Sequence, residues 1–197
     1  MNRPLRIAIA EDEPDMREYL EMTLPRLGHQ VVVAAETGRE LVERCRTARP
    51  DLVITDIKMP EMDGIAAATQ IFQEGPVPVI LLSAYHDPEL IERAEADHVL
   101  AYLVKPITEA DLRPTIAIAM RRFEQFQTLR QEAADLRQAL EERKVIERAK
   151  GVLMKRASVD EAEAFRRLQK LATEKRAKLV EVARLILSVE VISQPAE

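Results

Sequence analysis

The chain has 197 residues, 34 of them acidic and 29 basic, which gives a formal net charge of −5 at pH 7. Because Cys45 is the only cysteine, an internal disulfide and a cysteine-rich zinc site are excluded, and the three histidines lack the spacing of metal ligands. No apolar segment reaches the length of a membrane span and the N-terminus lacks the apolar region of a signal peptide, so we expect a cytoplasmic protein.

Four short apolar runs occur in the first part of the chain, and each is followed by a polar residue. Runs of this length, separated by amphipathic segments of helix length, are typical of buried strands in the parallel sheet of an α/β domain. Since the carboxyl ends of parallel strands share one edge of the sheet, we expect the polar residues to converge there. The runs are LRIAIA before Glu11 and Asp12, DLVIT before Asp56, VPVILL before Ser83, and AYLV before Lys105.

The polar residues at this edge have the chemistry of a site for magnesium and a phosphoryl group. Mg²⁺ prefers oxygen ligands, commonly one or two carboxylates together with water and phosphate oxygens, and Glu11, Asp12 and Asp56 provide carboxylates. The ammonium of Lys105 can pair with a carboxylate or a phosphoryl oxygen, and the hydroxyl of Ser83 can donate to another. Carboxylates act as nucleophiles in phosphoryl transfer, so Asp56, at the end of a central strand, is the predicted phosphoacceptor and Mg²⁺ the predicted cofactor.

Residues from about Leu5 to Met120 resemble a receiver domain of a bacterial two-component response regulator. The motifs that carry this resemblance are EDE at 11–13, TDIKMPEMDG at 55–64, LLSA at 81–84 and AYLVKP at 101–106. The resemblance implies a doubly wound, flavodoxin-like fold with a five-stranded parallel sheet, and a sensor histidine kinase as phosphodonor. Two departures, the absence of a glycine in ADHVLAYL and an isoleucine after the Lys-Pro pair, affect the output surface more than the chemistry.

The resemblance also implies a role for each residue at the edge of the sheet. Phosphorylation would draw the serine hydroxyl toward the phosphate and turn an aromatic switch inward, which changes the surface of the fourth helix, fifth strand and fifth helix. The implied roles are phosphoacceptor for Asp56, metal ligands for Glu11, Asp12, Asp56 and the backbone carbonyl of Lys58, phosphoryl contacts for Ser83 and Lys105, and switch for Tyr102. The sequence leaves open whether the peptide bond between Lys105 and Pro106 is cis.

From Thr108 onward the sequence predicts a long helix, because glycine and proline are rare there while charged residues and leucine increase. Apolar residues at alternating spacings of three and four predict a short parallel coiled coil over residues 122–140, and hence a homodimer on activation. The alternative is a helix packed on its own domain. The apolar positions are Phe126, Leu129, Ala133, Leu136 and Leu140.

A second unit follows, and apolar periodicity resolves it into three helices over residues 141–192. We expect Ser158 and Glu161 to form a capping box between the first two helices, and Ala162, Phe165 and Leu168 to contribute the apolar face of the second. Each helix has one apolar face, so three helices can bury a small shared core. The chain is thus expected to divide into residues 1–121, a linker helix over 122–140, and a helical domain over 141–192.

This second unit resembles the ANTAR family of RNA-binding transcription antitermination regulators. The most specific parts are AKGVLM at 149–154, EAF at 163–165 and EVA at 181–183. The resemblance implies binding to paired hairpin loops of a leader transcript, which prevents a terminator from forming. Residues 141–187 hold thirteen Lys and Arg against eight Asp and Glu, a net charge of about +5 in a chain of −5, which favours a polyanionic partner at this end.

Ten residues of the first two helices are the candidates for RNA contact, and four of them, Lys144, Arg148, Gly151 and Lys155, lie at helical spacings on one face of the first helix. A solvated helix face is the alternative for each of them taken singly. The second unit has few aromatic residues that could stack on bases. We therefore expect arginine and lysine contacts to phosphates and loop bases, and an RNA affinity that depends strongly on salt. The candidates are Lys144, Arg148, Lys150, Gly151, Lys155, Arg166, Arg167, Lys170, Lys175 and Arg176.

The function that these expectations describe is a phosphorylation-controlled RNA-binding antiterminator. One alternative is a DNA-binding response regulator, since three helices could contain a helix-turn-helix and basic composition does not separate DNA from RNA. Another is a signalling adaptor whose C-terminal helices bind a protein. A dedicated enzyme is the least favoured class, because phosphorylation of the chain itself accounts for the chemistry at the edge of the sheet.

Overall fold

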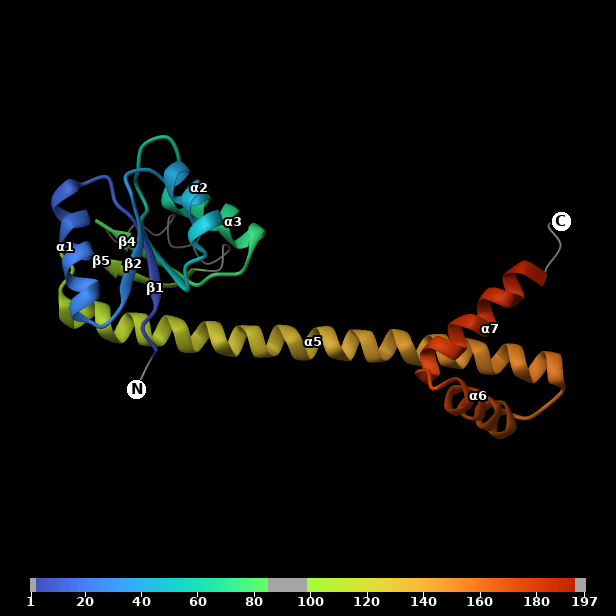
Figure 1. Cartoon of the computed structure of the whole chain (residues 1–197). Coiled ribbons are helices and arrows are strands. Elements are labelled where there is room, and N and C mark those ends of the chain that lie inside the picture. Colours follow the sequence, from blue (N-terminus) through green and yellow to red (C-terminus); the bar gives the residue numbers. More distant parts are fainter. Residues whose placement is uncertain (1–2, 85–98, 194–197) are drawn as a thin grey trace. The chain divides into compact units, whose positions relative to one another are not determined.

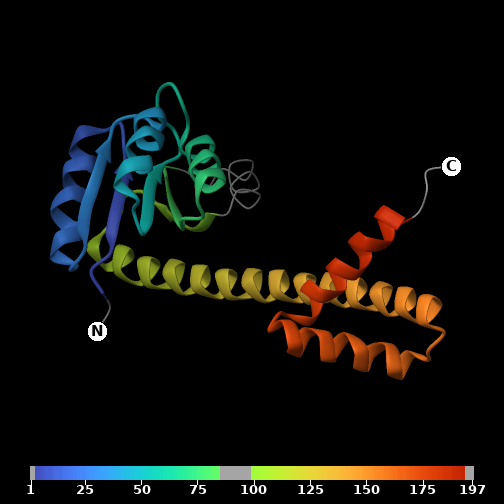
Figure 2. The same cartoon turned by 45° about the vertical axis from the view of Figure 1, so that its right-hand side comes forward.

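The computed structural model describes residues 3–84 and 99–193, and the side chains of the last helix as far as residue 188. The chain forms two compact units, Met1–Gln127 and Thr128–Glu197, which are drawn in Figures 1 and 2 and treated separately below. The helix expected between the fourth and fifth strands, and with it His86 and His98, lies outside the described residues.

The first unit is built on a five-stranded sheet in which all neighbouring strands are parallel. The order β2-β1-β3-β4-β5 places β3 in the centre, where every residue of the strand is buried. This confirms the predicted doubly wound, flavodoxin-like α/β fold. The strands are β1 (Arg6–Ala10), β2 (Gln30–Ala35), β3 (Leu52–Asp56), β4 (Val79–Ser83) and β5 (Val99–Val104).

Helices cover both faces of this sheet (Figures 1 and 2). On one face α2 (Gly38–Ala48) and α3 (Gly64–Glu74) bury a cluster that includes Leu41, Ile65 and Leu81. On the other face α1 (Pro14–Arg26) and the first turns of α5 (Glu109–Ala157) bury a cluster that includes Leu24, Ile54 and Leu112. Because successive strand residues point to opposite faces, each strand contributes to both clusters.

The second unit contains the end of α5, then α6 (Glu161–Lys175) and α7 (Leu179–Ser193). In Figure 2, α6 runs back along the last turns of α5 and α7 crosses them. Ala149 of α5, Leu168 of α6, and Val182 and Ala183 of α7 form its buried core. Three helices sharing one small core agree with the periodicity of the sequence.

Two details of the second unit differ from expectation. The N-cap of α6 is Asp160, whose side chain accepts a hydrogen bond from the backbone N–H of Glu163 (2.7 Å), so the predicted capping box of Ser158 and Glu161 is wrong. Ser158 has a φ of 51°, whereas an N-cap needs extended backbone. Ala162 is exposed, and Ala164 takes the buried position on α6 in its place.

The predicted apolar stripe lies along the middle of α5. Leu129, Leu136 and Leu140 are 66%, 72% and 55% exposed, so these side chains are not packed against their own unit. Phe126 is different, because its ring lies 6.3 Å from that of Phe72 on α3, centroid to centroid, at 57°. The coiled coil remains a prediction. No helix within the described ranges is both long enough and apolar enough to cross a membrane.

Candidate functional site at the carboxyl edge of the sheet

Three carboxylates converge at the carboxyl ends of β1 and β3. Glu11 and Asp12 follow β1 directly and Asp56 is the last residue of β3, and one carboxylate oxygen of each lies within 4.8 Å of the others. Glu11 is fully buried, Asp56 is 6% exposed, and Asp12 is exposed. The cluster therefore has a buried base and an open side toward solvent.

Lys105 joins this cluster from the end of β5. Its Nζ donates a hydrogen bond to Oε1 of Glu11 at 2.9 Å, and lies 3.5 Å from Oδ2 of Asp56 and 3.5 Å from Oε1 of Glu13. The side chain of Lys105 is only 11% exposed. One ammonium thus faces three close carboxylates and a fourth, Asp12, so the site carries an excess of negative charge.

The protonation equilibria reflect this crowding. Burial is the main cause that raises the pKa of Glu11; the hydrogen bond from Lys105 opposes it and the charge of Asp56 adds to it. Burial also raises the pKa of Asp56, against the attraction of Lys105. For Lys105, burial would lower the pKa, but the hydrogen bond to Glu11 and the charges of Asp56, Glu11 and Glu13 raise it. A cation bound among the carboxylates would reverse the destabilisation of their ionised forms.

Glu11 provides a direct test of whether a metal fits. Its Oε2 is buried and, within the described part of the chain, accepts no hydrogen bond, although the ammonium of Lys105 lies 2.9 Å away. Beyond this ion-pair contact, the buried oxygen keeps lone pairs that a bound cation could use. Together with Asp12 and Asp56 it gives an all-oxygen donor set, which fits Mg²⁺. Lys58, with an exposed side chain, follows in the loop two residues after Asp56.

The loop between β3 and α3 is held by close backbone approaches. A Cβ at Gly64 would overlap the carbonyl oxygen of Asp56, so this glycine is required by lack of space. Gly38, the first residue of α2, packs against the far end of the same loop, where a Cβ would lie 2.5 Å from the carbonyl oxygen of Met62. Gly64 is the last residue of the motif at 55–64 that supports the resemblance, whereas Gly38 has no distinguishing local pattern and was not identified from the sequence.

Arg17 is a second residue that the sequence did not reveal. From α1 its guanidinium donates to the backbone carbonyl of Glu11 at 2.7 Å and pairs with Glu36 at 2.8 Å. The side chain of Arg17 is 17% exposed. It therefore anchors the loop after β1 that presents Glu11 and Asp12.

Ser83 and Tyr102 lie on β4 and β5. Ser83 is the last residue of β4 and is buried, and its carbonyl accepts a hydrogen bond from the backbone N–H of Lys105 at 2.8 Å. Tyr102 is 48% exposed on the edge strand β5. The peptide bond between Lys105 and Pro106 is cis, which the sequence had left open. The predicted phosphoryl-site residues are thus brought to one edge, and Tyr102 lies on the adjoining surface strand.

The ten candidates for RNA contact differ in their surroundings. Lys144 pairs with Glu141, Arg166 and Arg167 both pair with Glu163, and Lys170 lies 3.9 Å from Glu174, all within single helices and all exposed. Lys150 is buried. Within the described chain, the side chains of Arg148, Lys155, Lys175 and Arg176 form no ion pair. Gly151 lies in α5, where a Cβ would meet no atom within 4 Å.

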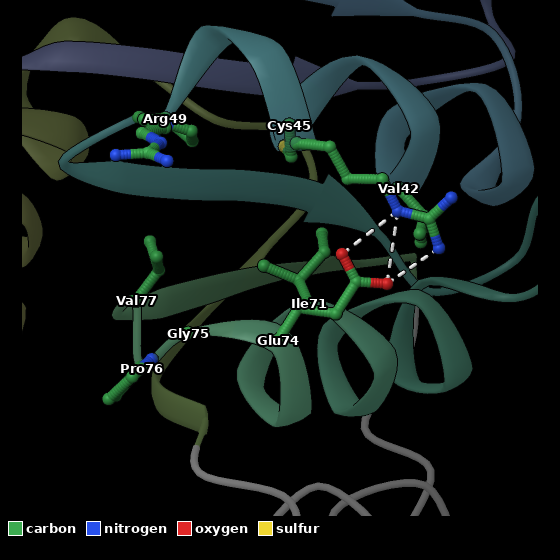
Figure 3. A pocket seen from close by; sticks show the side chains of 10 residues that line it. Val42, Cys45, Arg49, Ile71, Glu74, Gly75, Pro76 and Val77 are labelled. Atoms are coloured by element: carbon green, nitrogen blue, oxygen red, sulfur yellow. Dashed lines mark hydrogen bonds and ion pairs between the residues drawn. The ribbon is translucent and has the colours of Figure 1, made fainter.

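A hollow of about 410 Å³ lies at the opposite edge of the sheet, between the ends of α2 and α3 (Figure 3). Cys45 lines it, and burial raises the pKa of this thiol to about 12, so the thiolate is scarce at neutral pH. A three-fold hydrogen-bonded pair of Arg46 and Glu74 spans the hollow at 2.6–3.1 Å. The lining of this hollow lacks the cluster of carboxylates found at the acidic edge, which remains the candidate functional site.

Comparison with known proteins agrees with this geometry. The family model of the response regulator receiver domain matches residues 7–117, and that of the ANTAR domain matches residues 134–187. The transcriptional regulatory protein PdtaR of Mycobacterium tuberculosis is 41% identical over 184 residues, covering 93% of this chain and 90% of PdtaR. Among solved structures, the receiver domain of the response regulator NarL of M. tuberculosis has a TM-score of 0.58 and 26% identity, covering 61% of this chain and 98% of that domain. A chain of the CheX–CheY complex with BeF₃ and Mg from Borrelia burgdorferi has a TM-score of 0.55 and 25% identity, covering 57% of this chain and 87% of that one.

Proposed function

Because the chain belongs to the response regulators that combine a receiver domain with an ANTAR domain, we propose that Asp56 accepts a phosphoryl group and that this controls RNA binding by the second unit. The observation that carries the first half is the buried pairing of Lys105 with Glu11 and Asp56. An ammonium held between two carboxylates is a pre-positioned partner for the phosphoryl oxygens. The second half is supported by the ANTAR match and by the basic surface of α5 and α6.

Glu11, Asp12, Asp56 and the backbone carbonyl of Lys58 would hold Mg²⁺, which when bound neutralises charge that develops on the phosphoryl oxygens. A carboxylate oxygen of Asp56 attacks phosphorus in a phosphohistidine of the kinase. A P–O bond forms as the P–N bond breaks, and the bonding electron pair returns to the imidazole nitrogen. The open side of the acidic cluster, at exposed Asp12, gives the donor access.

Lys105 and Ser83 then stabilise the phosphorylated form. The ammonium of Lys105 needs to turn only from Asp56 and Glu11 toward the new phosphoryl oxygens, while the Ser83 hydroxyl donates to another oxygen. Ser83 is on β4, which pairs with β5, the strand that contains Tyr102. Movement of Ser83 is thereby coupled to the exposed tyrosine on the surface strand, as expected of a two-state switch.

Phosphorylation would act on the second unit through dimerisation. The exposed Leu129, Leu136 and Leu140 would pack against the same residues of a second copy in a parallel coiled coil. If the stripe occupies the a and d positions, Glu132 falls at g and Arg137 at the following e, so parallel helices place opposite charges together. An antiparallel pair would instead bring e positions together, and these are all cationic: Arg130, Arg137 and Lys144.

A parallel dimer would present two basic surfaces to two RNA hairpins. Exposed Arg148 and Lys155 and partly exposed Gly151 lie at helical spacing on one face of α5, and Lys175 and Arg176 are the last residue and the C-cap of α6. Linking two modules raises apparent affinity through effective concentration. Occupancy of a transcript by the dimer would then prevent a terminator hairpin from forming.

The first half is tested by phosphorylation with a small acyl phosphate, read as the phosphorylated fraction on a phosphate-affinity gel. We expect one phosphoryl group per chain with Mg²⁺, none with EDTA, and none in Asp56→Asn. Asp63→Asn is a suitable control, because Asp63 caps α3 through Ala66 N–H and asparagine can cap as well. Equal labelling of Asp56→Asn and the parent would refute the assignment.

A further inference from the structure

Lys150 is the one buried member of the ten basic-surface candidates, all of which lie in the described part of the chain. Its Nζ lies 2.8 Å from Oε2 of Glu147, one turn earlier on α5, and 2.6 Å from Oε1 of Glu161 on α6. The same Nζ lies 5.8 Å from the ring centroid of Phe165. Two carboxylates and an aromatic face therefore already surround this ammonium.

The contacts of Lys150 join two helices, whereas those of the other paired candidates stay within one. Lys144, Arg166, Arg167 and Lys170 pair with acidic residues three or four positions away, and such exposed pairs contribute little. Glu161 is eleven positions from Lys150 and is the first residue of α6. The pair therefore fixes the start of α6 against the side of α5.

The contact between Lys150 and α6 affects how the basic residues of α5 and α6 are arranged. Arg148 and Lys155 lie close to Lys150 in the sequence of α5 but are exposed, and Gly151, on the same face as these two, is partly exposed. Arg166 and Arg167 follow Phe165 directly on α6. A contact between Lys150 and the first two turns of α6 thus sets the distance and rotation between the basic residues of the two helices.

We propose that Lys150 is a positioning residue of the RNA-binding unit: through Glu161 and Phe165 it holds α6 so that the basic residues of both helices face one RNA. The proposal rests on the proposed RNA-binding function. It removes Lys150 from the set of direct RNA contacts, because contact with a phosphate would require the ammonium to leave two carboxylates. It also assigns a role in RNA binding to an acidic residue, Glu161.

Glu161→Gln separates positioning from direct contact by the sign of its effect. Removing a negative charge from a basic RNA-binding surface should tighten RNA binding if charge alone matters. If Glu161 positions α6, the same substitution should weaken binding, by about threefold to fivefold, the scale of a partly exposed ion pair. Affinity would be measured on the full-length protein with a two-hairpin RNA, at a temperature where circular dichroism shows every variant folded.

Glu174→Gln is the matched control. Glu174 is also on α6, is 59% exposed, and among the described residues forms an ion pair only with Lys170 of its own helix, at 3.9 Å. We expect Glu174→Gln to leave RNA affinity unchanged or slightly tighter.

The dependence of affinity on salt provides the second readout. A residue that contacts a phosphate contributes about one unit to the slope of log K against log salt. Lys150→Met should weaken binding without changing this slope. Unchanged or tighter binding by Glu161→Gln, or a slope reduced by about one in Lys150→Met, overturns the positioning role while leaving the proposed function intact. A parent protein that binds no hairpin RNA overturns both.

Discussion

Gly151 lies in the interior of a 49-residue helix, where glycine costs stability. Alanine is favoured over glycine in a helix interior by about 1 kcal/mol. A Cβ at Gly151 would meet no atom within 4 Å, so Gly151→Ala has no steric cost to offset that gain. We expect this substitution to raise the unfolding free energy of the second unit by about 1 kcal/mol. The folded chain therefore gives no steric reason for glycine at this position.

The same substitution should weaken RNA binding if a transcript approaches the backbone of α5 at this glycine. An extra methyl in a close contact costs about 1–3 kcal/mol, which corresponds to an affinity lower by a factor of about 5 to about 160. Gly151→Ala is thus expected to be more stable and a poorer RNA binder. Urea unfolding followed by circular dichroism measures the first effect, and fluorescence anisotropy with a labelled two-hairpin RNA measures the second.

Gly75→Ala is the control for this experiment. A Cβ at Gly75 also meets no atom within 4 Å, but the residue lies in the first unit with an extended φ of −179°. We expect it to change RNA affinity by less than the error of the assay. If the Gly151→Ala protein is more stable than the parent and binds RNA equally tightly, RNA does not approach the α5 backbone closely at this position.

Three further predictions follow from contacts in the two units. Gly64→Ala should destabilise the first unit by several kcal/mol and abolish phosphorylation, because its Cβ would overlap the Asp56 carbonyl; thermal unfolding and a phosphate-affinity gel measure this, and a parent-like Tm would contradict it. Leu136→Ser should shift the beryllofluoride-activated protein from dimer to monomer in sedimentation analysis, whereas Ala134→Ser, at an exposed position off the apolar stripe, should not; identical masses would count against the coiled coil. The hydrogen bond from the Lys150 ammonium lowers the pKa of Glu161 from its ordinary 4.5, so the ion pair stabilises the fold fully above pH 4.5 and progressively less as the pH falls below 4.5. The difference in unfolding free energy between the parent and Glu161→Gln should therefore shrink below pH 4.5. A difference that does not change with pH would exclude the ion pair as its source.

The acidic edge could be predicted because its signal is carried by residue type and strand position together. Apolar runs fix the strands, parallel topology fixes their common edge, and Glu11, Asp56 and Lys105 then have only one place to meet. Gly38 and Arg17 could not be found in this way. Their roles depend on which backbone atoms lie beside them, namely Met62 and Glu11, and no periodicity in the sequence encodes that proximity.

The basic surface was less predictable, because ion pairing depends on rotamers and on how helices pack. Lys150 and Arg148 are two residues apart and have the same charge, yet one is buried between two carboxylates and the other is exposed. The cap of α6 illustrates the same limit. Ser158 and Asp160 each precede a glutamate by three positions, and only the backbone conformation of the turn selects Asp160.

The central claim is that phosphorylation at Asp56 controls RNA binding by the second unit. The most direct test is the affinity of the full-length protein for a two-hairpin leader RNA, with and without beryllofluoride and Mg²⁺, for the parent and Asp56→Asn, with molecular mass measured on the same samples. The account predicts tighter binding and a larger mass only for the activated parent. Binding that is weak, salt-sensitive and equal in all four samples, or retention of a duplex DNA fragment in preference to the hairpins, would contradict it.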